Sequence, residues 1–217
     1  DQQVTNLDRF EIFFPERRQF FLENADLFSD FGLEGVRPFF SRRIGVTRDN
    51  STGSNVQNTI YGGARLSGKV NNNLRVGFLN MQAGKDESLN LPSINYTVGT
   101  VQQKVFSRSN IGFIFVNKQA FQDSLGSEFT ISPASYNRMA GIDYNLASAD
   151  NRWNGKFFYH RSFSPDNPDS AFAMGARLSY NTVKWDISGS AFNVGSNYSP
   201  EVGFVRRRDY LRLASST

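Results

Sequence analysis

The sequence predicts an all-β protein: an antiparallel up-and-down transmembrane β-barrel that follows a short N-terminal plug segment. Two observations favour this fold class. Segments of about ten residues alternate between apolar and polar side chains, which is the period of a strand with two unlike faces. Short and long connections also alternate along the chain, as the turns and loops of outer-membrane barrels do.

The alternation is clearest in three segments. IYGGARLSGKV places Ile60, Leu66 and Val70 on one face, and Arg65 and Lys69 on the other. FAMGARLSYN and VKWDISGSAFN repeat this pattern further along the chain. LRVGFLNMQA changes phase near Leu79, which predicts a β-bulge at that position.

About ten strands are expected, and their lengths suit a tilted membrane span of ~9–11 residues. Aromatic residues near the strand ends are expected to form girdles at the two membrane interfaces. These residues are Tyr96, Phe106, Tyr136, Trp153, Phe163 and Tyr180. The expected strands cover residues 38–47, 58–70, 74–83, 93–105, 109–117, 135–147, 152–163, 170–181, 183–193 and 201–212.

The connections between these strands are rich in Asn, Asp, Gly and Ser, as turn chemistry requires. Short ones are expected at 71–73, 106–109, 148–151 and 181–182, and long ones at 48–57, 84–92, 118–134, 164–169 and 194–200. A soluble barrel or sandwich with its apolar face inward is the alternative, because period two fits both. The long strands favour the membrane barrel, as does a polar face poor in Lys/Glu pairs.

Composition excludes several classes of protein. The chain has 217 residues, 21 of them Phe, and its 14% aromatic content argues against a disordered chain. The net charge of +4 is dispersed and no nucleic-acid-binding module is recognisable, so no nucleic acid partner is expected. No segment approaches the ~20 apolar residues of a membrane helix, and the first residues lack the pattern of a signal peptide.

Catalytic chemistry has little support in the sequence. One His and no Cys exclude His-rich zinc sites and Cys–His dyads. His160 and Ser162 share a strand face, but their spacing is generic and no G-x-S-x-G motif accompanies them. No catalytic, cofactor-binding or metal-binding residue is therefore assigned, no cofactor is expected, and an enzyme is disfavoured.

Two acidic stretches carry the oxygen ligands that calcium prefers. SPDNPDS offers Asp166, Asn167 and Asp169, and NADLFSD offers Asp26 and Asp30. Neither stretch matches the D-x-D-x-D-G calcium loop, and loops rich in Asp and Asn are usually turns. A calcium site is left open at this point.

Charged residues in phase with the polar strand faces are expected to line an aqueous lumen, where they would tune the selectivity for a solute. The alternative is that they pair with one another or with a plug. The residues are Arg42, Arg65, Lys69, Asp143, Lys156, Arg177, Lys184 and Asp186.

The N-terminal stretch FFPERRQFFLENADLF lacks strand alternation. Pro15 at a helix start, with Glu16 in the first turn, predicts a short helix over Glu16–Leu22. Residues 1–37 are expected to form the plug segment at the barrel mouth, and residues 38–217 the barrel strands. Glu16, Arg17, Arg18 and Glu23 are expected to pair with charged residues of the lumen.

NLDRFEIFFPERRQFFLENADLF and the following RPFFSRRIG resemble a Bacteroidetes family of outer-membrane β-barrel proteins, a domain of unknown function. GGARLSGK, YNRMAGIDYN and VGFVRRRDY extend the resemblance along the chain. The resemblance implies that these strands are part of a larger barrel. It also implies that longer members carry a signal peptide and an N-terminal carbohydrate-binding module of family nine type.

The resemblance implies a location in the bacterial outer membrane and contact with its lipid. The family resembled has no settled biochemical activity. The predicted barrel favours passage or docking of a solute, such as a glycan fragment, at the cell surface. A membrane-anchored surface hydrolase, or a structural or assembly barrel with protein partners, is the alternative. The sugar-binding module lies outside this chain, so no residue here inherits carbohydrate binding.

Overall fold

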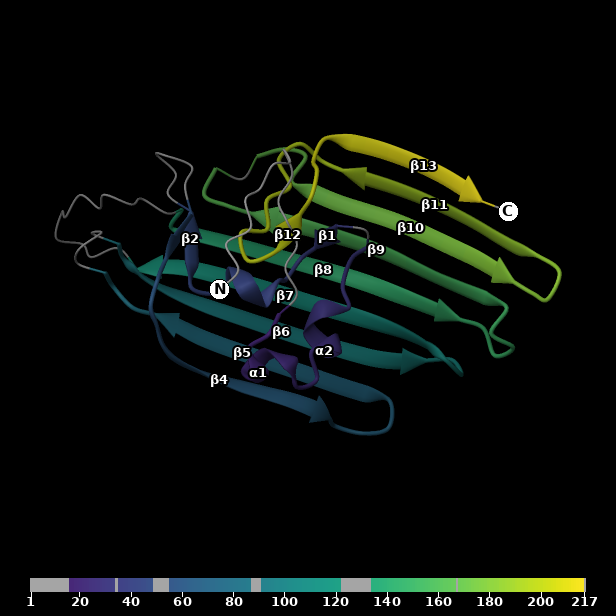
Figure 1. Cartoon of the computed structure of the whole chain (residues 1–217), viewed down its shortest axis with the longest axis horizontal. Helices are drawn as coiled ribbons and strands as arrows, with labels where there is room; N and C mark the ends of the chain where they lie inside the picture. Colours follow the sequence, from purple (N-terminus) through teal and green to yellow (C-terminus); the bar gives the residue numbers. More distant parts are fainter. Residues whose placement is uncertain are drawn as a thin grey trace.

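A computed structural model describes residues 16–33, 35–48, 55–86, 91–121, 134–166 and 168–216. In these residues, nine strands form one antiparallel sheet in which each strand pairs with the next along the chain (Figure 1). The nine strands are β4 (Ile60–Lys69), β5 (Leu74–Ala83), β6 (Ser93–Val105), β7 (Ser109–Phe121), β8 (Tyr136–Ala147), β9 (Trp153–Phe163), β10 (Phe172–Asn181), β11 (Asp186–Val194) and β13 (Tyr210–Ser216). The predicted all-β class and the antiparallel meander are confirmed.

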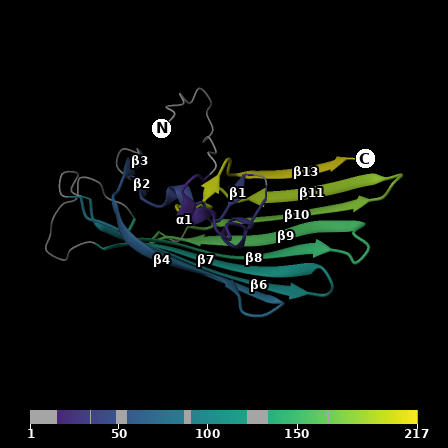
Figure 2. The same ribbon diagram turned by 60° about the horizontal axis from the view of Figure 1, so that its bottom comes forward.

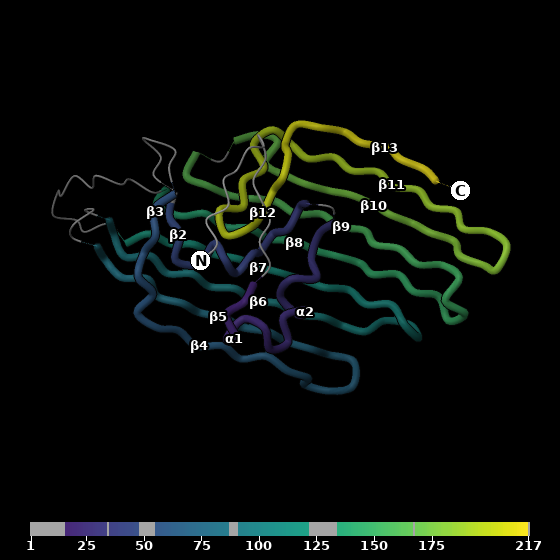
Figure 3. The backbone as a smooth tube through the Cα atoms, in the orientation of Figure 1, coloured from purple at the N-terminus to yellow at the C-terminus, as the bar shows by residue number. Residues whose placement is uncertain are grey.

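Tight turns join β4 to β5, β6 to β7, β8 to β9 and β10 to β11 at one end of the sheet, and the longer connections lie at the other (Figure 3). Local polar contacts close these turns. The Asn71 side-chain oxygen accepts the backbone N–H groups of Asn73 and Leu74 at 2.8 and 2.9 Å. Asn151 adopts a positive φ of 59°, which Asn tolerates better than most residues. We call these two ends the turn end and the loop end.

The remaining elements gather over one face of the curved sheet, which we call the inner face (Figure 2). Their pairing is local or long-range: β2 pairs with β3, whereas β1 pairs with β12 from the far end of the chain. They are α1 (Gln19–Leu22), α2 (Asp26–Ser29), β1 (Val36–Arg37), η1 (Ser41–Arg43), β2 (Val46–Arg48), β3 (Asn55–Gln57) and β12 (Phe204–Val205). We call residues 16–33 and 35–48 the docked segment.

The hydrophobic core lies between the docked segment and the inner face. Leu27 and Phe28 of α2 and the following Phe31 are buried against inner-face residues that include Leu79 and Val98. Burying each such side chain stabilises the fold by roughly 1.5–3 kcal/mol. Phe21 and Phe28 of the N-terminal stretch are therefore part of the hydrophobic core, although the stretch lacks the regular apolar pattern of a helix.

The inner face of the sheet is apolar near the loop end and charged near the turn end. The outer face has the opposite arrangement. On β5, Leu79 and Met81 are buried on the inner face near the loop end, and Asn80 lies between them on the outer face. Toward the turn end the order reverses, because Phe78 is exposed on the outer face and Arg75 is on the inner one. A strand can thus change phase in sequence while its backbone stays regular.

The expected bulge near Leu79 is wrong for this reason. The pairing of β5 with β6 runs without a register shift from Leu74 to Ala83. The shift in the sheet lies instead between Ile60 and Gly62, where β4 begins to pair with β5.

The strand expected over 38–47 is also wrong. Backbone N–H groups of Arg43 and Ile44 donate to the carbonyls of Phe40 and Ser41, which closes the 3-10 turn η1. Gly45, at φ 80°, then redirects the chain into the short strand β2.

Other expected bounds also change. The strand predicted over 109–117 extends to Phe121, into the connection predicted at 118–134. The strand predicted over 201–212 divides into β12 and β13, and the one predicted over 183–193 begins at Asp186, after a turn that Thr182 closes with Trp185. The helix predicted over Glu16–Leu22 begins only at Gln19. The Glu16 carboxylate accepts the N–H groups of Arg17 and Arg18 and holds Arg18 extended. Pro15 lies outside the described residues.

The sheet has two edges, β4 and β13, which do not pair with each other in the described part of the chain. The described residues contain no helix of the length and apolar character that a membrane crossing requires.

Candidate functional site

Glycines on the inner face let rings of the docked segment reach the sheet backbone. A Cβ atom at Gly77 would lie 2.7 Å from the Phe28 ring, and one at Gly112 would lie 2.9 Å from the Phe31 ring. Real Cβ atoms do not approach other atoms so closely, so a larger residue would displace the ring at either position. Gly77 in β5 and Gly112 in β7 therefore form seats for the docked segment.

A buried polar network lies beside these seats. Asp143 of β8 is only 1% exposed; its Oδ1 lies 2.6 Å from His160 Nε2 of β9, and its Oδ2 accepts the Gly32 backbone N–H at 2.7 Å. Lys156 Nζ lies 3.5 Å from Asp143 Oδ2 and donates to the Asp30 carbonyl and carboxylate at 2.7 and 3.0 Å. A buried carboxylate needs such partners, since an unpaired one is very costly. The network thus ties two strands to the docked segment.

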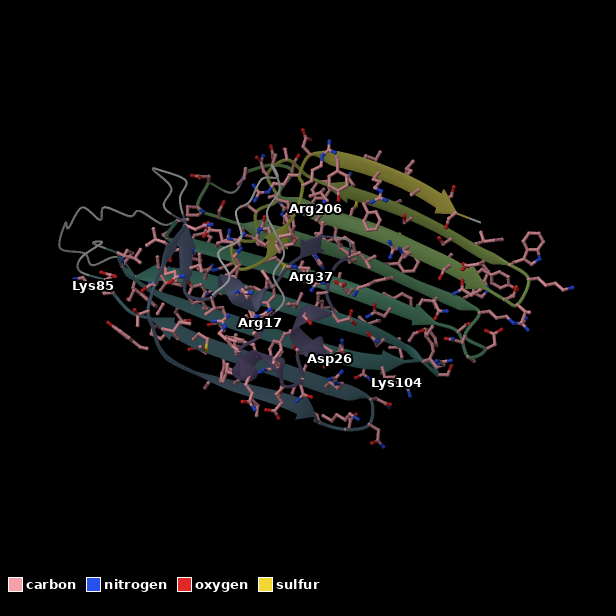
Figure 4. The ribbon with its side chains drawn as sticks, in the orientation of Figure 1. Arg17, Asp26, Arg37, Lys85, Lys104 and Arg206 are labelled. Carbon is pink, nitrogen blue, oxygen red and sulfur yellow. The ribbon has the colours of Figure 1, made fainter. Side chains whose placement is uncertain are left out.

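A second set of contacts holds the docked segment to β4 and β5. The Arg65 guanidinium donates to the backbone carbonyls of Phe20 and Glu23 and lies 4.8 Å from the Phe28 ring centroid. Arg75 Nη1 donates to Asp26 Oδ2 at 2.7 Å. Figure 4 shows Asp26 over the middle of the sheet and Lys104 toward its turn end. Charged strand residues therefore face polar groups of the docked segment at both of its helices.

Glu16 connects the start of the docked segment to η1, which belongs to the same segment. Its carboxylate receives Arg18 Nε and Nη2 at 3.0 and 2.8 Å, and the Ser41 hydroxyl at 2.5 Å. Burial of the Glu16 carboxyl opposes its ionisation, but the hydrogen bonds from Arg18 and Ser41 outweigh this and lower its pKa to about 2. The start of the segment is thus fastened to η1 by an ionised carboxylate.

The contacts do not assemble the Ser–His pair considered from the sequence. Ser162 Oγ donates to the Ala171 carbonyl at 3.4 Å and accepts the Ser199 N–H at 3.0 Å, so its partners are backbone groups. His160 directs Nε2 to Asp143, and its Nδ1 is buried without a hydrogen-bond partner.

The carboxylates of the acidic stretch NADLFSD have partners other than a metal. Asp26 and Asp30 pair with Arg75 and Lys156 of the sheet. Within the described ranges, no three His, Cys, Asp or Glu side chains lie close enough together to hold a metal ion. Asn167 of the other stretch lies outside those ranges.

A family model for DUF5916, a domain of unknown function, matches residues 1–214. The chain belongs to the DUF5916 family. No curated protein and no solved structure matches the chain.

The DUF5916 domain brings three of the residues predicted to line a lumen into contact with the docked segment, namely Arg65, Asp143 and Lys156. The other five lie apart from these contacts. Lys69, Arg177 and Asp186 are on the inner face near the turn end, Lys184 is in the β10–β11 turn, and Arg42 is in η1 rather than on a strand. Whether any of them lines water stays a prediction.

The residues predicted to belong to a plug lie on the docked segment of the DUF5916 domain. Glu16 and Arg18 pair with each other instead of with strand residues, and Arg17 is exposed. Glu23 meets the sheet through its backbone carbonyl, which accepts from Arg65. Sequence reasoning missed Arg75 because the change of phase in β5 hid its inner-face position, and nothing in the sequence marked Gly32.

The outer face of the DUF5916 domain carries an exposed apolar band that crosses every strand of the sheet. Cross-strand pairs connect it, for example Leu66 with Phe78, and Phe113 with Ile142. Leu66 is 69% exposed and Phe113 is 51% exposed. One member from each strand, from β4 to β13, is Leu66, Phe78, Val101, Phe113, Ile142, Tyr159, Met174, Ile187 and Leu213.

A polar band borders the apolar one on the loop-end side of β5 to β8. Asn80, Thr97, Asn117 and Arg138 follow one another across these four strands. Their side chains are hydrogen-bonded, with Asn80 Nδ2 to Thr97 Oγ1 at 2.8 Å and Arg138 Nε to Asn117 Oδ1 at 3.1 Å. The exposed apolar side chains of β5 to β8 are therefore interrupted by this polar band, and Phe121 of β7 is exposed beyond it.

Aromatic residues border the apolar band at the turn end. Trp153 and Tyr180 are in contact there, with ring centroids 4.8 Å apart, and Phe106 is 85% exposed in its turn. Tyr96, which was expected in a girdle, is instead buried on the inner face, so that expectation is wrong for this residue.

Proposed function

We propose that this DUF5916 domain is part of the wall of an outer-membrane β-barrel that docks or admits a solute. Its outer face lies against lipid, and its docked segment fills part of the lumen as a plug. The observation that carries the proposal is the exposed apolar band, which crosses all nine strands of the sheet.

The band has the character of a lipid-facing surface. Soluble proteins rarely expose a contiguous apolar patch of more than a few hundred Å². On β9 the band runs from Trp153 to Tyr159, roughly 20 Å along an extended strand, which is comparable with the ~25 Å apolar belt of outer-membrane barrels. Its borders, aromatic at the turn end and polar at the loop end, are those expected where a bilayer meets water.

The placement of charge supports a lumen on the other face. Toward the turn end the inner face carries Lys69, Lys104, Arg177 and Asp186, whereas the outer face there is apolar. Charged side chains on a lipid-facing surface are strongly unfavourable. An aqueous interior accommodates them and gives a polar solute a path along the sheet.

The proposal requires that both edges of the sheet be paired in the membrane. An unsatisfied backbone N–H or C=O group costs several kcal/mol in lipid, so barrels close completely. Further strands of the same wall are proposed to pair with β4 and β13.

The test uses the full-length protein. It should be extracted from membranes only with detergent, and it should give conductance steps in planar lipid bilayers. Recovery in the aqueous fraction without detergent, or bilayers that stay silent at every protein concentration, would overturn the proposal. Cleavage of a polymer by the silent protein would favour the hydrolase alternative, and a co-purifying protein the assembly alternative.

A further inference from the structure

A polar hollow of about 1060 Å³ opens at the loop end of the inner face. It lies between strands β2 and β3, the inner face of β7 and β8, residues 164–166 and 168, and the connection at 196–208. Binding sites for small molecules commonly measure ~300–1,000 Å³, so the hollow has room for a solute with several polar groups. It is separate from the buried network around Asp143.

Hydrogen bonds hold the wall of the hollow in place. The Asn137 side chain donates to the Ser199 carbonyl at 2.9 Å and accepts the Glu201 N–H at 3.0 Å. Ser162 Oγ accepts the Ser199 N–H, and Asn197 Nδ2 donates to the Asp169 carbonyl at 2.7 Å. The connection at 196–208 is thereby fixed to β8, β9 and its neighbouring loop, which preorganises the hollow for a ligand.

The floor of the hollow is an ion pair. Lys118 of β7 is 2% exposed, and its Nζ lies 2.8 Å from Glu201 Oε2. Glu201 is more exposed than its partner, and both residues line the hollow. A carboxylate held in this way can accept hydrogen bonds from hydroxyl groups of a solute.

Positive charge predominates among the described side chains that line the hollow. The basic residues among them are Arg43, Lys118, Arg206 and Arg208, and the acidic ones are Asp166 and Glu201. Arg208 Nη2 donates to Ser199 Oγ at 3.2 Å, which places its guanidinium along the wall. Guanidinium groups suit carboxylate and phosphate oxygens because their donors form a planar fork.

We propose that this hollow binds a small anionic solute that carries hydroxyl groups and a carboxylate or phosphate group. The inference deepens the proposed function, on which it rests, by naming the class of solute docked at the loop end. The arginines engage the anion, while Glu201 and the hydroxyl-bearing wall around Ser199 accept and donate to the hydroxyls. No bond is made or broken.

The test is isothermal titration calorimetry on the full-length protein in detergent micelles. The probes are glucuronate, glucose 6-phosphate and neutral glucose, which differ in the anionic group on a similar ring. At least one anion should bind ten-fold or more tightly than glucose, and added salt should weaken it. The better anion identifies the solute's charged group. Equal affinity for all three probes, or no binding of either anion, overturns the inference.

Variants locate the binding. Arg208→Gln and Arg206→Gln should each weaken the better anion five-fold or more, and Arg208→Lys should keep part of the affinity if charge is what matters. Arg152→Gln, in the β8–β9 turn at the opposite end, is the matched control and should leave affinity unchanged. Unchanged affinity in both glutamine variants places the binding elsewhere and overturns the inference.

Calorimetry in micelles is independent of conductance, so the two proposals fail separately. Anion binding without conductance would contradict the proposed passage of a solute but support the anion site. Conductance without anion binding would contradict the anion site but support the proposed barrel.

Discussion

The Asp143 carboxylate accepts a hydrogen bond from the Gly32 backbone N–H at 2.7 Å, across 111 positions of the chain. Asp143 also meets His160 and Lys156, so a single buried carboxylate connects the sheet to the docked segment. Removing its charge should therefore act on the docking of the segment as well as on the stability of the sheet.

Asp143→Asn should destabilise the protein by about 2–4 kcal/mol, because Lys156 and His160 lose a buried anionic partner. Urea unfolding in micelles measures the stability, and limited proteolysis within residues 16–48 measures docking. Asp150→Asn, in an exposed turn, is the control and should leave the free energy of unfolding almost unchanged. Equal effects of the two substitutions would contradict the role given to Asp143.

Gly32→Ala should release the docked segment. Gly32 has φ 75°, and a Cβ atom there would lie 2.0 Å from the Val36 carbonyl oxygen. Backbone strain and the clash together should cost at least about 2 kcal/mol, seen as faster proteolysis of the segment. Gly62→Ala is the matched control, since nothing lies within 4 Å of its Cβ position and it should be almost neutral. A segment that stays protected in Gly32→Ala would show that it does not need this backbone geometry.

Arg65→Gln should increase the conductance of single channels or the frequency of opening. The substitution removes the guanidinium that holds the carbonyls of Phe20 and Glu23, so the docked segment should leave the lumen more often. Lys69→Gln on the same strand and face is the control, because it removes the same charge without touching the segment. If both variants change conductance equally, charge in the lumen rather than docking is responsible.

Phe113→Lys should weaken folding into lipid vesicles by about 2–4 kcal/mol if the apolar band faces the centre of the bilayer. Asn117→Lys is matched in strand and face but lies in the polar band, so its effect should be below about 1 kcal/mol. Urea titration of vesicle-folded protein gives both values. A well-tolerated lysine at Phe113 would count against a lipid-facing band.

Docking should weaken in acid because of Glu16. Its folded pKa of about 2 lies below the usual 4.5, so the ionised carboxylate stabilises the docked segment above pH 4.5, and this contribution is lost as pH falls toward 2. Pepsin cleavage within the segment should accelerate over that window. Glu16→Gln should be cleaved faster than wild type at pH 5 and equally fast near pH 2. Parallel curves for the two proteins would exclude Glu16 as the source.

The strands were predictable because their physical cause is local. Two segments that alternate over about ten residues, joined by turn residues such as Asn71 or Asn151, predict a hairpin. No information from the rest of the chain is needed. The predicted bulge at Leu79 failed for the opposite reason. Whether Leu79 or Phe78 is buried depends on where the docked segment lies, which is information from outside the strand.

The candidate site was predictable only in part. Alternation placed Arg65, Asp143 and Lys156 on polar strand faces, but their partners in the docked segment lie more than forty positions away along the chain. Gly32, Gly77 and Gly112 are needed because a Cβ atom at these positions would clash with neighbouring atoms. A single sequence does not show which glycines have this role.

The distance along the chain between Asp30 and Lys156 also fixes an order of events in folding. Their contact spans 126 positions, whereas each hairpin of the sheet closes over neighbouring residues. Local pairings form fast, and long loops close slowly. Asp30 of the docked segment precedes β9 in the chain and is therefore secured to Lys156 only after β9 is in place. Until β5 and β7 have paired, Phe28 and Phe31 lack their seats at Gly77 and Gly112, and the contact of Asp30 with Lys156 follows later still.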